Sequence, residues 1–342
     1  MEHGGNVHKI QRERKIDTLV DFSANINPFG LNKKIKEEII NNIDGIVHYP
    51  DPDNYDLVGM IAEKHSVMRE NILCGNGASD LIFRIVEAFR PEESLLIEPT
   101  FSEYRKALKR FSNINTIESI HYDLDLLSRI KNTDVTLNMI FVCNPNNPTG
   151  ILAEDSFLEG IIDYAKKENI TLIVDESFID FTHSKSLISK YHNDIIILRS
   201  FTKMYAIAGL RLGYLVSSPE VIKKIKEISP TWQVSSLASA AGICAFHLEG
   251  FEEKTRSLID KERDYLKSNL KKMGFEFYDS SANYICFKSH IEDLDSKLLD
   301  VGIAIRNCDN YIGLGENYYR IAVRSREDNT VLINSLLKLC KE

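Results

Sequence analysis

The residues best suited to chemistry lie in the stretch SFTKMYAIAGLRLGY, residues 200 to 214. Its one lysine, Lys203, stands among small and apolar residues, with Ser200 three positions before it and Arg211 eight positions after it. This layout is typical of a lysine that forms a Schiff base beside a phosphate-binding cradle. The same residues would also suit a surface lysine and arginine between two strands, because isolated motif matches are common.

A second stretch, ILCGNGASDLIFRIVEAF at residues 72 to 89, predicts a seat for a phosphate. A short apolar strand leads through a glycine-rich turn into a helix with one apolar face. The first turn of such a helix presents free backbone N–H groups and the positive end of the helix dipole to an anion. The stretch does not match a dinucleotide-binding fingerprint, because Asp80 occupies the position of the third glycine.

Polar and aromatic residues also follow other predicted strands. Asp175 ends the strand TLIVD, and a carboxylate at the end of a buried strand is costly unless a cation pairs with it. MIFVCNPNNPTG predicts a buried strand that runs into a turn rich in Asn and Pro and contains Asn147. Phe101 follows a strand that ends at Pro99, where it could stack on a flat ring or pack in the core.

The order of helices and strands, with polar residues at strand ends, predicts an open α/β sheet that binds its ligand at the carboxyl edge. From residue 235 to about 273 the pattern indicates a helix that leads into a smaller domain with the strands NYICFK and YYRIAVR. We therefore divide the chain into an N-terminal arm with part of the small domain (1–40), a large domain (41–235) and a small C-terminal domain (236–342).

Composition excludes several classes of protein. The 342 residues include 42 basic and 50 acidic ones, for a net charge of -8, and no basic run interleaves with aromatics, so we expect no nucleic-acid partner. The six cysteines show neither zinc-site nor disulfide spacing, which predicts reduced thiols and no metal. Without an apolar leader or a long apolar run, we expect a cytoplasmic protein with no membrane partner.

The motif Ser-x-Thr-Lys followed by Gly-x-Arg-x-Gly resembles the lysine motif of fold-type I enzymes that use pyridoxal 5′-phosphate (PLP), the class I/II aminotransferase superfamily. The resemblance implies a large α/β domain, with a central mostly parallel sheet flanked by helices, and a smaller α+β C-terminal domain. It makes Lys203 and Asp175 catalytic. The implied cofactor contacts are Gly77, Ala78, Ser79, Phe101, Asn147, Asp175, Ser200, Lys203, Arg211 and, from a second subunit of a homodimer, Tyr49. Simple loop packing is the alternative for Tyr49.

The start of the chain resembles a narrower family. HGGN followed by DFSANINP is similar to the L-threonine-O-3-phosphate decarboxylases of cobalamin biosynthesis, whereas the related histidinol-phosphate aminotransferases usually carry Glu where this chain has Ile26. Those aminotransferases also often carry Tyr in place of Phe178 and Gly in place of Arg324. A flexible arm followed by an edge strand is the alternative for this start.

The substrate contacts follow from the same resemblance. A guanidinium fork grips a carboxylate with two hydrogen bonds, and the family places its carboxylate-binding arginine at Arg320. A second arginine on the same face of that strand suits a phosphorylated substrate, with a solvated strand-end charge as the alternative. We interpret Arg306 as a solvated charge. The expected substrate-binding residues are His3, Gly4, Asn27, Arg320 and Arg324.

We therefore predict a PLP-dependent decarboxylase of L-threonine O-3-phosphate, with histidinol-phosphate aminotransferase as the alternative. The sequence leaves open which phospho-amino acid is used, because the choice of the bond that breaks depends on substrate pose. A PLP-binding transcription regulator would need a basic DNA-binding module, which this acidic chain lacks. The hypothesis of a nucleotide-binding oxidoreductase is disfavoured because the dinucleotide-binding fingerprint lacks its third glycine.

Overall fold

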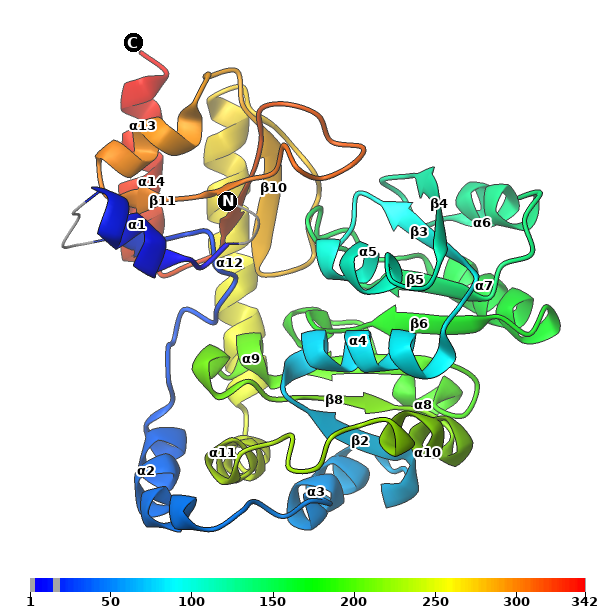
Figure 1. Cartoon of the computed structure of the whole chain (residues 1–342). Coiled ribbons are helices and arrows are strands. Elements are labelled where there is room, and N and C mark those ends of the chain that lie inside the picture. Colours follow the sequence, from blue (N-terminus) through cyan, green and yellow to red (C-terminus); the bar gives the residue numbers. More distant parts are fainter. Residues whose placement is uncertain (1–3, 15–18, 342) are drawn as a thin grey trace.

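In the computed structural model, which describes residues 4–14 and 19–341, a central sheet of seven strands has the order β2, β8, β7, β6, β5, β3, β4 (Figure 1). The strand β8 runs antiparallel to both β2 and β7, and the neighbouring pairs from β7 to β4 are parallel. The bounds are β2 (Ile72–Gly75), β3 (Glu93–Glu98), β4 (Asn113–Glu118), β5 (Met139–Cys143), β6 (Thr171–Asp175), β7 (Ile196–Ser200) and β8 (Gly213–Val216). The predicted mostly parallel sheet is confirmed.

Helices cover both faces of this sheet, which explains why its inner strands are apolar throughout. On β5, Phe141 belongs to the core formed with α4, α5 and α10, whereas Val142 belongs to the core on the opposite face. In Figure 1, α4 lies in front of the sheet. The helices of this domain are α3 (Tyr55–His65), α4 (Gly77–Phe89), α5 (Ser102–Leu108), α6 (Leu124–Lys131), α7 (Asp155–Lys167), α8 (Ile188–Tyr191), α9 (Phe201–Met204) and α10 (Pro219–Glu227), with the short helices η2 (Arg69–Asn71), η3 (Ile179–Phe181) and η4 (Ala208–Leu210).

A smaller antiparallel sheet, in the order β12, β13, β10, β9, lies at the upper left of Figure 1. The N-terminal strand β1 joins this part of the molecule by pairing in parallel with β11. The elements here are α1 (Val7–Arg14), β1 (Val20–Asp21), α12 (Phe251–Lys272), β9 (Glu276–Phe277), β10 (Tyr284–Lys288), α13 (Leu294–Asp300), β11 (Ile303–Ala304), β12 (Arg306–Asn307), β13 (Tyr318–Ala322) and α14 (Arg326–Leu339). The predicted α+β character of the small domain is confirmed.

The helix expected from residue 235 to about 273 is two helices, α11 (Ser236–Phe246) and α12. The chain turns between them, and Gly250 has a φ of +66°, a left-handed conformation that glycine adopts readily. The helix α11 packs against α2 (Lys33–Asn41), which η1 (Ile43–Val47) follows, and against α3. The domain boundaries at residues 40 and 235 stay predictions. None of the described helices is long and apolar enough to span a membrane.

Candidate active site

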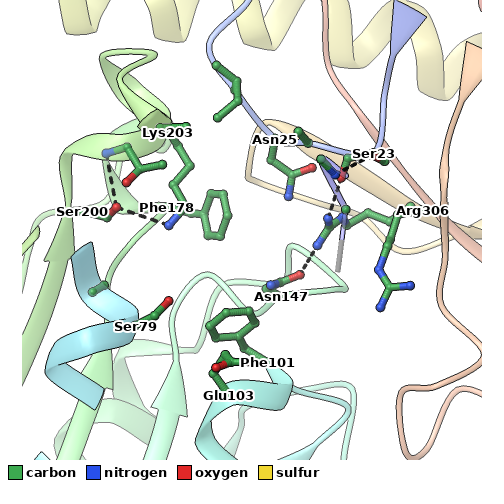
Figure 2. Close-up of a pocket in the computed structure, with 18 of the residues that line it drawn as sticks. Ser23, Asn25, Ser79, Phe101, Glu103, Asn147, Phe178, Ser200, Lys203 and Arg306 are labelled. Atoms are coloured by element: carbon green, nitrogen blue, oxygen red, sulfur yellow. Dashed lines mark hydrogen bonds between the residues drawn. The ribbon is translucent and has the colours of Figure 1, made fainter. Parts of the chain in front are cut away.

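A cavity of about 710 Å³ lies between the two sheets, at the carboxyl ends of β6 and β7 and the first turn of α4. Figure 2 shows Ser79, Ser200 and Lys203 on one side of it and Ser23, Asn25 and Arg306 on the other. Parallel strands deliver their last residues to one edge of a sheet, so residues distant in sequence meet there. The cavity therefore occupies the edge that the sequence pattern predicts.

Lys203 lies in α9, the short helix that follows β7 directly. Ser200 caps this helix by accepting a hydrogen bond from the backbone N–H of Thr202, and Lys203 Nζ donates to Ser200 Oγ at 3.3 Å. Burial lowers the pKa of Lys203, and the positive charges of Arg211 and Arg320 act in the same direction, against the opposing effect of Asp175. A buried amine of lowered pKa is a better nucleophile toward a carbonyl group.

Asp175 ends β6 and is 4% exposed. Its Oδ1 accepts a hydrogen bond from the backbone N–H of Ser177 at 2.8 Å, and its Oδ2 accepts one from the hydroxyl of Tyr104 at 2.7 Å. Both Asp175 and Lys203 line a smaller cavity of about 70 Å³ that lies behind the main one. A buried carboxylate at this position could pair with a cationic group of a ligand.

The first turn of α4, where the sequence predicts an anion seat, lies at the cavity. Gly77 has a φ of +80°, and a Cβ on it would lie 2.6 Å from Nη2 of Arg211. Ala78, Ser79 and Arg211 all line the cavity. Arg211 itself has a φ of +58°, and such strained backbone at a non-glycine residue is typical of a ligand site. A phosphate here would meet helix N–H groups, a hydroxyl and a guanidinium.

Asn147 and Phe101 line the cavity from the ends of their strands. Asn147 Oδ1 accepts a hydrogen bond from Nη1 of Arg320, whose Nη2 donates to the carbonyl oxygen of Ser23 at 3.0 Å. Arg320 is 6% exposed, and within residues 4–14 and 19–341 its Nε has no hydrogen-bond partner. A buried donor of this kind suits an incoming carboxylate.

Arg306 is a cavity residue, which corrects its interpretation as a solvated charge. It is 2% exposed and lies directly across from Arg320 in the pairing of β12 with β13. Its Nη2 donates to Oδ1 of Asn310 at 2.7 Å, and its guanidinium carbon lies 5.6 Å from the ring centre of Tyr311. Only the strand register reveals this pairing, since the sequence separates the two arginines by fourteen positions.

Arg324 and Asn27 do not line the cavity, contrary to the expected substrate contacts. Arg324 donates from Nε to Asp328 Oδ2 at 3.0 Å and from Nη1 to the carbonyl oxygen of Asp21 at 3.0 Å. Asn27 is buried away from the cavity, where its amide donates to Met204 O at 2.7 Å and to Thr255 Oγ1 at 3.0 Å. Both side chains are thus committed to holding segments of the chain together.

The motif DFSAN supplies other residues to the cavity instead. Ser23 and Asn25 both line it, and Asn25 Oδ1 is buried without a hydrogen-bond partner in the described part of the chain. Gly4 also lines the cavity as expected, and a Cβ on it would lie 2.0 Å from the carbonyl oxygen of Ser23. The predicted contact at His3 lies outside the described residues.

Tyr49 does not line the cavity of its own chain. Its side chain is 79% exposed and stacks on Trp232, with ring centres 4.5 Å apart. The contact of Tyr49 with the cofactor of a second subunit stays a prediction, because the structure describes a single chain.

The comparison with known proteins identifies the family. The model of aminotransferase class I and II matches residues 17–336, and the chain belongs to that family. It is 37% identical to a threonine-phosphate decarboxylase from Salmonella typhimurium, with 98% of this chain and 95% of that protein covered. A histidinol-phosphate aminotransferase from Moorella thermoacetica is 27% identical, over 98% of this chain and 89% of that one.

Solved structures give the same picture. The L-threonine-O-3-phosphate decarboxylase from Porphyromonas gingivalis has a TM-score of 0.84 at 26% identity, covering 94% of this chain and 99% of that one. The histidinol-phosphate aminotransferase from Clostridium acetobutylicum has a TM-score of 0.86 at 29% identity, with the same coverage. The fold is therefore the aminotransferase fold, and the two activities share it.

The enzymes of this family use PLP, and the cavity fits that cofactor. The turn at Gly77 leaves room for a phosphate where a Cβ would fill the space beside Arg211. Lys203 and Asp175 lie in the same cavity, as a covalent anchor and a ring-nitrogen partner require. The hydroxyl of Ser177, which also lines that cavity, is buried without a partner among the described residues.

Proposed function

We propose that this chain is a PLP-dependent carboxy-lyase that converts L-threonine O-3-phosphate to (R)-1-aminopropan-2-yl phosphate and carbon dioxide, in cobalamin biosynthesis. The bond from the α-carbon to the carboxylate breaks, and a proton takes the place of the lost carbon dioxide. The proposal draws support from the 37% identity to the Salmonella decarboxylase over nearly the whole chain.

The observation that carries the proposal is the pair of buried arginines in the cavity wall. Arg306 and Arg320 are direct cross-strand neighbours, and two like charges so placed repel each other. A substrate with two anionic groups suits this pair, because each guanidinium can take one of them. We assign the substrate carboxylate to Arg320 with Asn147, and the substrate phosphate to Arg306.

Each remaining residue has a defined task. When bound, PLP draws the electron pair of the breaking bond into its ring. Lys203 would hold the cofactor, and its amine would hold or deliver a proton at the α-carbon of the substrate. Asp175 would stabilise the positive charge of the ring nitrogen, and Ser79, Ser200 and Arg211 would hold the cofactor phosphate.

The alternative is a histidinol-phosphate aminotransferase, which the structural likeness to the Clostridium enzyme favours. Phe178 argues against it, since it lines the cavity where those relatives often carry a tyrosine. Histidinol has no carboxylate, so one arginine would be left without an anion in that half-reaction. The decarboxylase reaction therefore needs both Arg306 and Arg320 to bind substrate, whereas the histidinol-phosphate half-reaction needs one of them.

Mass spectrometry of the PLP-loaded protein with L-threonine O-3-phosphate, and no keto-acid acceptor, tests the proposal. Repeated release of carbon dioxide with formation of the amine phosphate is the expected result. Stoichiometric or absent product, together with amino transfer from histidinol phosphate to 2-oxoglutarate, would establish the alternative. O-phosphoserine serves as the competing substrate, since the sequence left the phospho-amino acid open.

We also propose that the enzyme is a cytoplasmic homodimer in which Tyr49 reaches the cofactor phosphate of the second subunit. The exposed stacked pair of Tyr49 and Trp232 supports this, because two large aromatic rings in solvent suit a surface that another chain covers.

A further inference from the structure

Tyr104 is a buried residue at the cofactor cavity to which the sequence motifs assign no task. It lies in α5, one turn after Phe101, and is fully buried. Its hydroxyl donates a hydrogen bond to Asp175 Oδ2 at 2.7 Å. Among the described residues, no other side chain donates to this carboxylate; its second donor is the backbone N–H of Ser177.

The ring of Tyr104 is held on two sides. It stacks on Phe141 of β5, with ring centres 4.8 Å apart and planes 16° apart. It also meets the ring of Phe101 edge to face, at 5.6 Å and 85°. These contacts fix the direction of the hydroxyl and support Phe101 in the cavity wall.

The hydroxyl stays a donor at every working pH. Burial raises the pKa of Tyr104 well above its ordinary value, and the neighbouring negative charge of Asp175 acts in the same direction. The phenol therefore stays protonated and donates its hydrogen bond to the carboxylate.

A donor at this position matters because Asp175 is a buried carboxyl group. An apolar environment favours the neutral form of a carboxyl group and disfavours its anion. Opposite a pyridine nitrogen, the shared proton would then move from the ring to the carboxylate, and the ring would lose its positive charge. Hydrogen bonds to the anion oppose this transfer, since they stabilise the ionised form.

We propose that Tyr104 is a positioning residue that keeps Asp175 ionised and oriented toward the ring nitrogen of PLP while it supports Phe101 against the ring. The inference rests on the role of Asp175 given under the proposed function. It does not depend on whether the bond that breaks leads to decarboxylation or amino transfer, because it concerns the cofactor before any substrate binds.

Tyr104→Phe tests the hydroxyl alone, because the phenyl ring keeps both aromatic contacts. We expect the pH midpoint of the cofactor's visible absorbance to rise by about one unit, the order of a charge-assisted hydrogen bond. The positive charge of the ring repels a proton on the nitrogen that Lys203 contributes. Without that charge, the pKa of this nitrogen rises. Cofactor affinity, measured by PLP titration, is expected to fall about tenfold.

Tyr122→Phe is the matched control. Tyr122 is also fully buried, but its hydroxyl has no hydrogen-bond partner in the described chain, and the residue lines neither cavity. This variant loses the same atom from the core. Its absorbance midpoint should equal that of the wild type.

A double-mutant cycle with Asp175→Asn separates positioning from packing. The midpoint shift caused by Tyr104→Phe should vanish in the Asp175→Asn background, where there is no carboxylate to keep ionised. An equal shift in both backgrounds, or no shift in either, would overturn the proposal. If Tyr104→Phe does not fold, Tyr104→Met serves the same cycle.

Discussion

At the scale of single residues, the cavity contains side chains that must be in opposite charge states to function. Lys203 must lose a proton to react, and its own burial lowers its pKa, with the positive charges of Arg211 and Arg320 acting in the same direction. Arg306 and Arg320 must stay charged to bind anions, and Asn310 and Asn147 each accept a hydrogen bond from one of them. The cavity therefore places one lysine that must be neutral beside two arginines that must be charged.

Replacing Arg306 with Gln should weaken binding of phosphorylated substrate selectively. Loss of a charge-assisted hydrogen bond predicts a rise in KM for L-threonine O-3-phosphate of about 10- to 100-fold, with little change for unphosphorylated threonine. Arg324→Gln is the control, because that arginine is engaged by Asp328 outside the cavity wall. Steady-state kinetics on both substrates measure the effect, and equal losses on the two would remove Arg306 from the phosphate site.

The lowered pKa of Lys203 predicts a pH dependence of stability in the apoprotein. The unfolded chain binds a proton at Lys203 up to the ordinary pKa of 10.5, whereas the folded chain releases it at lower pH. Because the unfolded state then holds more protons, this residue's contribution to stability rises with pH in that window. Apo wild type should therefore gain stability relative to Lys203→Met between the lowered pKa and 10.5.

Urea denaturation of both apoproteins across that pH range measures the difference. A constant difference between the two would mean that Lys203 keeps its ordinary pKa in the folded chain.

At the scale of elements, short segments that follow parallel strands carry the chemistry. The helix α9 begins where β7 ends, and α4 begins just after β2, so a lysine and an anion seat face one space. Gly77 in the turn between β2 and α4 has a φ of +80°, which other residues rarely adopt, and a Cβ there would displace the guanidinium of Arg211. The anion seat thus depends on one backbone conformation.

Gly77→Ala should lower PLP affinity by about tenfold or more, because a Cβ would strain the backbone and collide with Arg211. Gly315→Ala is a matched control, since Gly315 has the same φ of +80° and open space around it. Both variants should lose similar stability from backbone strain, and only Gly77→Ala should lose cofactor. PLP titration and thermal unfolding of the two give the comparison; similar cofactor losses would contradict the collision.

At the scale of the whole molecule, the cavity is built from both ends of the chain. Gly4 and Ser23 line it from the N-terminal segment, while Arg306 and Arg320 come from β12 and β13 of the small sheet. The parallel pairing of β1 with β11 fixes the N-terminal segment beside the small sheet. A complete substrate site therefore requires the N-terminal arm to be in place.

A homodimer of about twice 39.1 kDa is the expected state in solution. Trp232 is the one tryptophan of the chain and is 48% exposed, so its fluorescence reports directly on burial of that surface. Dilution should shift its emission to longer wavelength as dimers dissociate, and sedimentation velocity should follow the same transition. A monomer that binds PLP with undiminished affinity would remove Tyr49 from the cofactor site.

Local sequence determined much of this protein. The spacing of Ser200, Lys203 and Arg211 and the glycine turn before α4 are properties of contiguous residues, and alternating strands and helices imply a sheet with a binding edge. Ligand-binding chemistry at those places therefore follows from local pattern. The boundary between α11 and α12 did not follow from local pattern, because the sequence around Gly250 otherwise continues a helical pattern.

Only the tertiary structure decided which arginines and asparagines reach the cavity. Arg306 and Arg324 are both arginines close to Arg320 in the sequence. Strand register places Arg306 opposite Arg320 in the cavity wall. Arg324 instead donates hydrogen bonds to Asp328 and to the carbonyl oxygen of Asp21, outside the cavity. Asn25 lines the cavity while Asn27, two residues on, holds α9 and α12 together. Such outcomes depend on strand register and on contacts such as those of Asn27 with Met204 and Thr255, which join segments 177 and 228 residues apart and which no local pattern encodes.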